Sequence, residues 1–292
     1  MLDLKPLLQE KRPNLSKTSL ITYNSILRSL YKKVFNSLDI DPAKYNETEP
    51  ILNHLKSLEP NKRKTILAAL VVVSDQREYR DLMIEDIKAY NKEIAKQEKT
   101  KSQTESWIDK EDLNKLFTEH EKTAKLLYKK NKLTSSDYQD IQNYILLCLL
   151  GGKYIPPRRA LDYIAFKIKN IDKKVDNYKT TKDLIFNTYK TAKTYGKQTV
   201  PIPQPLKLIL NKWIRENPTD YLLFDSSFNK LSNVKLTQRL NKLFGKRVSV
   251  NQLRHTYLTD NYLEHHEKQK ELENDLTNMG TSVLQVPTYI KH

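Results

Sequence analysis

The chain has 292 residues, of which 51 are Lys or Arg and 35 are Asp or Glu, so its formal net charge is +16. Its length suggests two domains of ordinary size, and a 38% share of hydrophobic residues is enough to form buried cores. The five glycines fall well below the roughly 7% of an average protein. This disfavours a glycine-rich phosphate loop and a turn-rich all-β fold. The single cysteine, Cys148, excludes an intrachain disulfide and a cysteine-rich zinc site.

The excess of positive charge predicts a polyanionic partner, with nucleic acid first and an anionic membrane surface second. Arginine is the more informative cation here, because its planar guanidinium matches the oxygens of a phosphate. The longest apolar runs are too short to span a bilayer. The charged N-terminus lacks the apolar core of a signal peptide. We therefore expect an intracellular protein that is not secreted.

Apolar residues at three- and four-residue spacing predict a helix over about 17–35, with Ser16 as its N-cap. Further helices are predicted over about 49–58, from Pro60 to about 73, and from about 77 to 94. Together they predict a compact N-terminal bundle of about four helices.

Residues 96–105 carry no apolar side chain, which favours an interdomain linker over the frayed end of a helix. Order is predicted to resume with Asp109 as an N-cap. Helical periodicity then predicts further helices at about 110–128, 135–150, 204–216, 233–244, 250–267 and 272–279.

Between these helices the hydrophobic period changes. Short alternating or apolar stretches at 161–170 and 183–190, with an extended segment at 198–203 and a turn at 194–196, predict a small antiparallel β-sheet. The predicted fold class is therefore mainly α: an N-terminal four-helix bundle, then a mostly helical domain with this sheet.

Four separated segments carry the residues with chemical interest. They are PPRRALDY at 156–163, KTYGKQTVPIP at 193–203, NQLRHTY at 251–257, and MGTS at 279–282 followed by Tyr289. In this order they resemble the segments of tyrosine recombinases, the phage integrase family, whose catalytic domain is similar to that of type IB topoisomerases.

The resemblance covers nearly the whole chain. Residues 1–98 resemble the family's helical core-binding domain, which binds DNA, residues 99–106 form a linker, and residues 107–292 resemble its catalytic domain. The resemblance implies a site-specific DNA recombinase or integrase that cleaves and rejoins DNA through a 3′-phosphotyrosine intermediate. Mobile genetic elements and viral genome integration are the settings that it suggests.

The resemblance also implies roles for individual residues. Arg159 and Arg254 correspond to two arginines that hold the scissile phosphate. Lys193 corresponds to a hairpin lysine that protonates the leaving 5′-oxygen, and Tyr289 corresponds to the nucleophile. These residue types suit the chemistry, because a tyrosine ester stores the bond energy and two guanidinium groups stabilise charge on the phosphate oxygens without a metal.

Two positions depart from the family's pattern. Asn251 stands where a histidine is usual, and Thr281 where histidine or tryptophan is usual. Neither side chain can shuttle a proton as imidazole does. Three further residues are assigned supporting roles: Arg158 as the alternative to its neighbour, Asp162 as the acid after the arginine, and His255 as either a buttress or a proton carrier.

The expected partner is double-stranded DNA, bound by a homotetramer on two sites, with no metal, no cofactor, no small-molecule substrate and no membrane. Three alternatives remain open at this stage. They are a catalytically weak or inactive DNA-binding protein with the recombinase fold, a topoisomerase-like nicking and closing enzyme, and a basic scaffold for RNA or anionic membrane.

Overall fold

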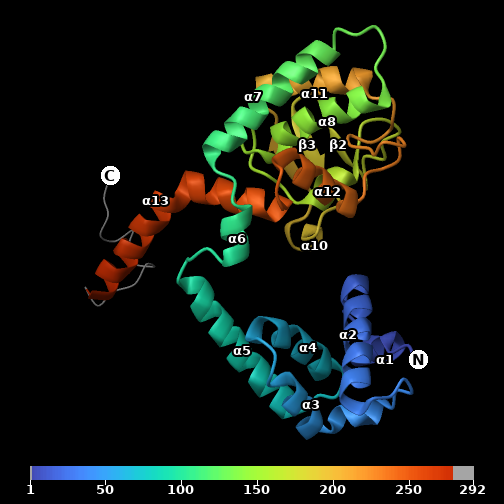
Figure 1. Cartoon of the computed structure of the whole chain (residues 1–292), viewed down its shortest axis with the longest axis vertical. Coiled ribbons are helices and arrows are strands. Elements are labelled where there is room, and N and C mark those ends of the chain that lie inside the picture. Colours follow the sequence, from blue (N-terminus) through green and yellow to red (C-terminus); the bar gives the residue numbers. More distant parts are fainter. Residues whose placement is uncertain (1, 279–292) are drawn as a thin grey trace. The chain divides into compact units, whose positions relative to one another are not determined.

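A computed structural model of the chain describes residues 2–278. The chain forms two compact units, Met1–Glu98 and Lys99–His292 (Figure 1). Both are mainly helical, and a small sheet lies in the second, so the predicted fold class is confirmed. No helix within residues 2–278 is long and apolar enough to cross a membrane.

The first unit is built entirely of helices in its described part. They are α1 (Lys5–Lys11), α2 (Lys17–Phe35), the 3-10 helix η1 (Pro42–Asn46), α3 (Thr48–Leu55), α4 (Pro60–Val73) and α5 (Arg77–Ala95). The predicted cap of α2 is confirmed, because Ser16 accepts a hydrogen bond from the backbone N–H of Ser19. The sequence did not predict α1, which buries one side chain, Leu8, and is too short to show a period.

Buried tyrosines and one ion pair connect the helices of this unit. Tyr45 donates its hydroxyl to the Leu27 carbonyl, and Tyr79 donates to the Tyr45 carbonyl, each at 3.0 Å. Arg63 of α4 makes two hydrogen bonds to the carboxylate of Asp86 on α5, which is 2% exposed. Paired in this way, the buried charge is compatible with the apolar core.

The second unit begins with a helix inside the segment predicted as a linker. This helix, α6 (Lys101–Ser106), has a capping box between Thr100 and Gln103, which compensates for its lack of buried residues. The other helices are α7 (Lys110–Leu127), α8 (Ser135–Leu150), α9 (Ala160–Ile164), α10 (Ala192–Tyr195), α11 (Gln204–Glu216), α12 (Asn233–Phe244) and α13 (Val250–Asn278). The sequence predicted two helices where α13 is continuous.

The core of the second unit surrounds α8. From Tyr144 to Leu150 each residue of this helix is buried, and α7 and α11 pack against it. Cys148 is part of this core, and burial raises the pKa of its thiol to about 12. The ring of Trp213 on α11 stacks on Phe224 at an interplanar angle of 11°. The apolar run of α8 thus serves as the central element of the core.

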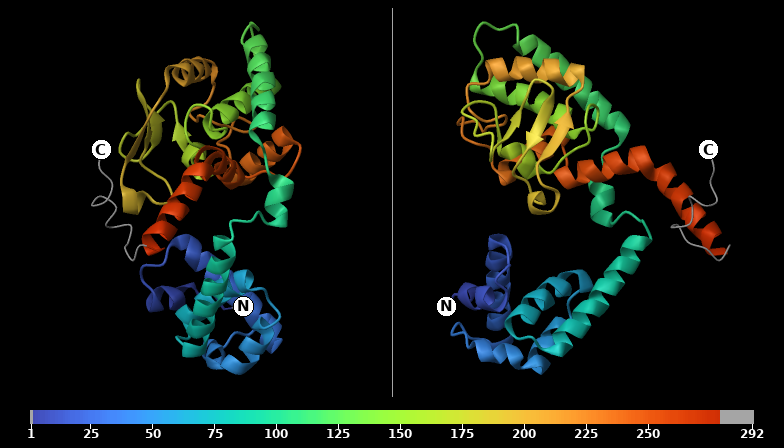
Figure 2. Two further views of the ribbon diagram at one scale, coloured as in Figure 1. Left: turned by 90° about the vertical axis from the view of Figure 1, so that its left-hand side faces the viewer. Right: turned by 180° about the vertical axis from the view of Figure 1, so that it is seen from behind.

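The sheet has the order β1-β2-β3-β4, with strands β1 (Phe166–Lys167), β2 (Asn177–Lys179), β3 (Asp183–Phe186) and β4 (Gln198–Pro201). The left view of Figure 2 shows it on one side of the helices of this unit. The antiparallel pairing of β3 with β4 agrees with the prediction, whereas β2, which the sequence did not predict, pairs antiparallel with β3 and parallel with β1. The sheet is therefore mixed.

The strand predicted over 161–170 is wrong in its first half. Residues 160–164 form α9, and only Phe166–Lys167 pair as a strand. Asp162, in the first turn of α9, forms an ion pair with Arg158, which lies just before the N-cap residue Arg159. The alternating apolar pattern was misleading because this turn is buried on more than one side.

Candidate functional site

A pocket of about 320 Å³ brings together three segments that are far apart in the sequence. They are the loop before α9 with the start of that helix, the hairpin between β3 and β4, and the first turns of α13. Its lining consists of Pro156, Pro157, Arg158, Arg159, Asp162, Tyr189, Thr191, Tyr195, Gln198 and Arg254. We call it the arginine pocket.

Arg158 is held in place by several contacts. Its Nε donates to Oδ2 of Asp162 at 2.9 Å, and its Nη1 donates to Oε1 of Gln198 at 2.7 Å. Its guanidinium also lies 4.0 Å from the ring centroid of Phe186, a favourable cation–π distance. These contacts give Arg158 a positioning role, because they tie the loop before α9 to β4.

Unlike Arg158, Arg159 and Arg254 have guanidinium groups that no described residue bonds. Both side chains are half-buried in the pocket, and within residues 2–278 neither guanidinium makes a hydrogen bond or an ion pair. Burial, followed by the charge of Arg159, lowers the pKa of Arg254. Two close guanidinium groups without partners repel each other, and an anion between them would relieve this repulsion.

Among the described residues that line the pocket, Asp162 is the one that carries a negative charge. Its side chain is 2% exposed, and burial raises the pKa of its carboxyl, while the charges of Arg158, Arg159 and Arg254 oppose that shift. Its Oδ1 is buried and has no hydrogen-bond partner among the described residues. Three arginines facing one carboxylate leave the pocket with an excess of positive charge, which suits a phosphate group.

Asn177 connects the pocket to the sheet. It is 1% exposed; its Nδ2 donates to the carbonyls of Asp162 and Thr188, and its Oδ1 accepts from the backbone N–H groups of Asn187 and Thr188. These four bonds join β2, the end of β3 and α9. Nothing in the sequence singled out Asn177, because its partners lie in two other segments of the chain.

The hairpin between β3 and β4 is closed by a tyrosine. The hydroxyl of Tyr189 donates to the carbonyl of Gly196 at 2.7 Å, and Gly196 has a φ of +63°, which favours glycine. Lys193 lies in this hairpin on α10 and is exposed. It does not line the arginine pocket, although Thr191 and Tyr195, two residues to either side, do.

A glycine sets the distance between α13 and the end of α8. Gly152 has a φ of +75°, and a Cβ atom on it would lie 2.4 Å from Cδ2 of Tyr257. Tyr257 follows Arg254 by three residues on α13, so the two side chains lie on neighbouring positions of the same helix face. Gly152 therefore permits the close approach that brings Arg254 to the pocket.

The other predicted residues have different positions. Asn251 is exposed in the first turn of α13, three residues before Arg254 and on the same face. His255 is also exposed, and its ring has no hydrogen-bond or ion-pair partner within residues 2–278. Thr281 and Tyr289 lie outside the described residues.

The structure thus brings Arg158, Arg159, Asp162 and Arg254 together. Sequence reasoning missed Gln198, which orients Arg158, together with the pocket tyrosines and Asn177. Gln198 stands in the predicted hairpin, and it was interpreted there only as part of an extended strand.

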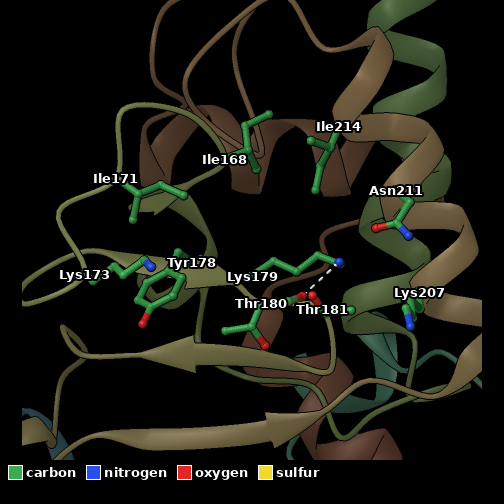
Figure 3. Close-up of a pocket in the computed structure, with 10 residues that line it drawn as sticks. All are labelled: Ile168, Ile171, Lys173, Tyr178, Lys179, Thr180, Thr181, Lys207, Asn211 and Ile214. Atoms are coloured by element: carbon green, nitrogen blue, oxygen red, sulfur yellow. Dashed lines mark hydrogen bonds between the residues drawn. The ribbon is translucent and has the colours of Figure 1, made fainter.

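A second pocket, of about 580 Å³, lies between β2, the turn that leads to β3, and α11 (Figure 3). Lys173, Lys179 and Lys207 line it, opposite three isoleucines. Nζ of Lys179 donates to the Thr180 carbonyl at 3.0 Å, and burial, followed by the charge of Lys207, lowers the pKa of Lys179. None of the predicted site residues within 2–278 lines this pocket.

Neither a protein-family model nor a curated protein matches the sequence. Among solved structures, that of XerA recombinase is similar to this chain, with a TM-score of 0.36 and 14% sequence identity. The similarity covers 89% of this chain and 83% of that chain. The function proposed below therefore rests on the residues and on the arginine pocket.

Proposed function

We propose that the protein is a site-specific DNA recombinase of the tyrosine class, which cleaves and rejoins DNA through a 3′-phosphotyrosine. The observation that carries the proposal is the arginine pocket. Arg159 and Arg254 come from distant segments, line one pocket and have no partner among the described residues. The net charge of +16 supports a nucleic-acid partner.

In the proposed reaction, the hydroxyl oxygen of Tyr289 attacks the scissile phosphorus and its proton passes to solvent. The bond from phosphorus to the 5′-oxygen breaks, and Lys193 gives that oxygen a proton. Arg159 and Arg254 hold the non-bridging oxygens, where charge builds up in the transition state. The reverse sequence, with a new 5′-hydroxyl as nucleophile, rejoins the strand without a nucleotide cofactor.

The two units are proposed to divide the work. Residues 1–98 would contact DNA, residues 99–106 would connect the units, and residues 107–292 would carry out the chemistry, as a homotetramer on two duplexes. The many lysines would contribute sequence-independent affinity for the DNA backbone, which weakens steeply as the salt concentration rises.

A second candidate is a catalytically silent DNA-binding protein with the same pocket. Two residues favour it, because Asn251 and Thr281 stand where the family usually has proton-carrying or aromatic side chains. A general acid or base typically contributes about 10²–10⁴-fold to a rate. A nicking and closing enzyme that does not exchange partners is a third candidate.

The test is covalent trapping with the full chain. Candidate duplexes carry a nick close to the cleavage position, so that cleavage releases a short fragment and cannot reverse. The readout is a denaturant-resistant adduct of protein and DNA. We expect an adduct with the wild type and none with Tyr289→Phe or Arg254→Ala.

Two controls make the result decisive. Arg215→Ala removes an exposed arginine of α11 and is expected to leave the adduct unchanged. Strand exchange between two labelled duplexes separates recombination from nicking and closing. Salt-sensitive DNA binding without an adduct on any substrate would refute the recombinase proposal in favour of the silent DNA-binding protein.

A further inference from the structure

A pocket of about 750 Å³ lies among α7, α8 and α12 in the second unit. In the described part of the chain it shares no lining residue with the arginine pocket. Its chemistry comes mainly from His120, Gln139, Asp140, Asn143, Arg239 and Lys242. We call it the α12 pocket, and its size falls in the range of about 300–1,000 Å³ that is usual for small-molecule sites.

Three polar atoms of this pocket are buried without a hydrogen-bond partner among the described residues. They are Nδ1 of His120, Oε1 of Gln139 and Nη1 of Arg239. Buried polar atoms in folded proteins are normally bonded, and three such atoms on three different helices in one pocket are unusual. The described residues thus leave three polar atoms of the pocket lining without a hydrogen bond.

Arg239 is the strongest of the three observations. Within residues 2–278 its guanidinium has no hydrogen bond and no ion pair. Burial lowers its pKa to about 10, although the charges of Asp225 and Asp140 oppose this shift. Asp225 is engaged elsewhere: its Oδ2 accepts from Nζ of Lys235, and its Oδ1 accepts from the backbone of Ser227 and Asn229.

Gln139 provides a hydrogen-bond acceptor beside Arg239, and one hydrogen bond fixes the orientation of its side-chain amide. Its Nε2 donates to the Asp225 carbonyl at 3.2 Å, which leaves Oε1 as the unbonded atom. A matching ligand must therefore present both an oxyanion for Arg239 and a hydroxyl or N–H donor for Gln139. Lys242 adds positive charge at the exposed rim, and Asp140 offers a second acceptor.

We propose that the α12 pocket binds a phosphate ester, with the guanidinium of Arg239 holding the phosphate and Oε1 of Gln139 accepting from a hydroxyl or N–H of the ligand. The phosphate can belong to a free nucleotide or to a nucleic-acid backbone, and the same two groups would hold it in either case. The proposal is independent of strand cleavage.

The experiment measures binding of inorganic phosphate and of AMP to the full chain by isothermal titration calorimetry, with chloride at equal ionic strength as the reference. We expect both to bind, AMP the more tightly because it adds hydroxyl and N–H donors. Hydrogen bonds to a charged group are strong enough that Arg239→Gln should weaken binding about ten- to a hundredfold. Gln139→Met should weaken AMP more than inorganic phosphate.

Controls and a second arm complete the test. Arg215→Gln, an exposed arginine of α11, removes the same charge and should leave both affinities unchanged, and circular dichroism verifies that every variant folds. Competition with a short duplex identifies the source: displacement of AMP assigns the pocket to a nucleic-acid phosphate, and simultaneous binding assigns it to a free nucleotide. Absence of binding at millimolar ligand, or equal affinities of the wild type and Arg239→Gln, would overturn the proposal.

Discussion

Replacing Arg158 by Met is expected to destabilise the second unit far more than replacing its neighbour Arg159. The two arginines are adjacent in the sequence but differ in their contacts. Arg158 is 18% exposed and bonded to Asp162, which is 2% exposed, whereas Arg159 has no partner within residues 2–278.

The magnitude follows from the carboxylate that is left behind. Removing one partner of a buried ion pair typically destabilises a protein by about 3–5 kcal/mol. Arg158→Met also loses the bond to Gln198 but retains apolar packing on Phe186, so we expect a loss of about 3 kcal/mol. Arg159→Met breaks no hydrogen bond or ion pair with a described residue and is expected to stay within about 0.5 kcal/mol of the wild type.

The assay is urea unfolding followed by tryptophan fluorescence. Both tryptophans of the chain, Trp107 and Trp213, lie in the second unit, and Trp213 is fully buried. The fluorescence change therefore reports unfolding of this unit. The double variant Arg158→Met with Asp162→Asn is expected to recover about 1 kcal/mol or more, because residues in contact are energetically coupled.

DNA affinity provides the complementary measurement. Arg159→Met should weaken DNA binding at low salt while leaving stability unchanged. Arg158→Met should lower stability and leave DNA binding unchanged, at temperatures where the variant remains folded. Equal losses of stability in the two variants, or no loss in Arg158→Met, would refute the distinction drawn between the two arginines.

Three further predictions concern stability. Gly152→Ala is expected to lower the free energy of unfolding by about 1–3 kcal/mol, because its φ of +75° and the ring of Tyr257 leave no room for a Cβ. Thermal unfolding measures this loss. Gly245 also has a positive φ but has open space around it, so comparison with Gly245→Ala isolates the cost of the clash with Tyr257. Asn177→Asp should cost about 3 kcal/mol, since a buried carboxylate cannot donate to the two carbonyls that Nδ2 now satisfies; an unchanged urea midpoint would contradict it. Asp137 has a pKa of about 2, below its usual 3.8, mainly because of its bond to Lys130, so its contribution is present above pH 3.8 and is lost as the pH falls through 2. Asp137→Asn should accordingly be less stable than the wild type at pH 7, with a gap that narrows below pH 4.

Much of the helical framework follows from local sequence. The predicted bounds of α11 and α12 agree with the structure, and the predicted caps at Ser16 and Asp109 both accept the expected backbone hydrogen bonds. Periodicity and capping depend on residues within about one turn of each other. The order of the segments in the sequence likewise indicated Arg159 and Arg254 as candidate phosphate-binding residues.

The partners and the burial of the charged side chains were decided only by the tertiary structure. Arg158 and Arg159 are the same amino acid side by side, and their contacts in the folded unit distinguish them. Arg158 bonds to Asp162 and Gln198 and packs on Phe186, whereas Arg159 has no hydrogen bond or ion pair within residues 2–278. The parallel pairing of β1 and the burial of Arg239 depend in the same way on distant segments. The free energy of a charged group is determined by its burial and its partners, and in a folded chain these come from residues that are remote in the sequence.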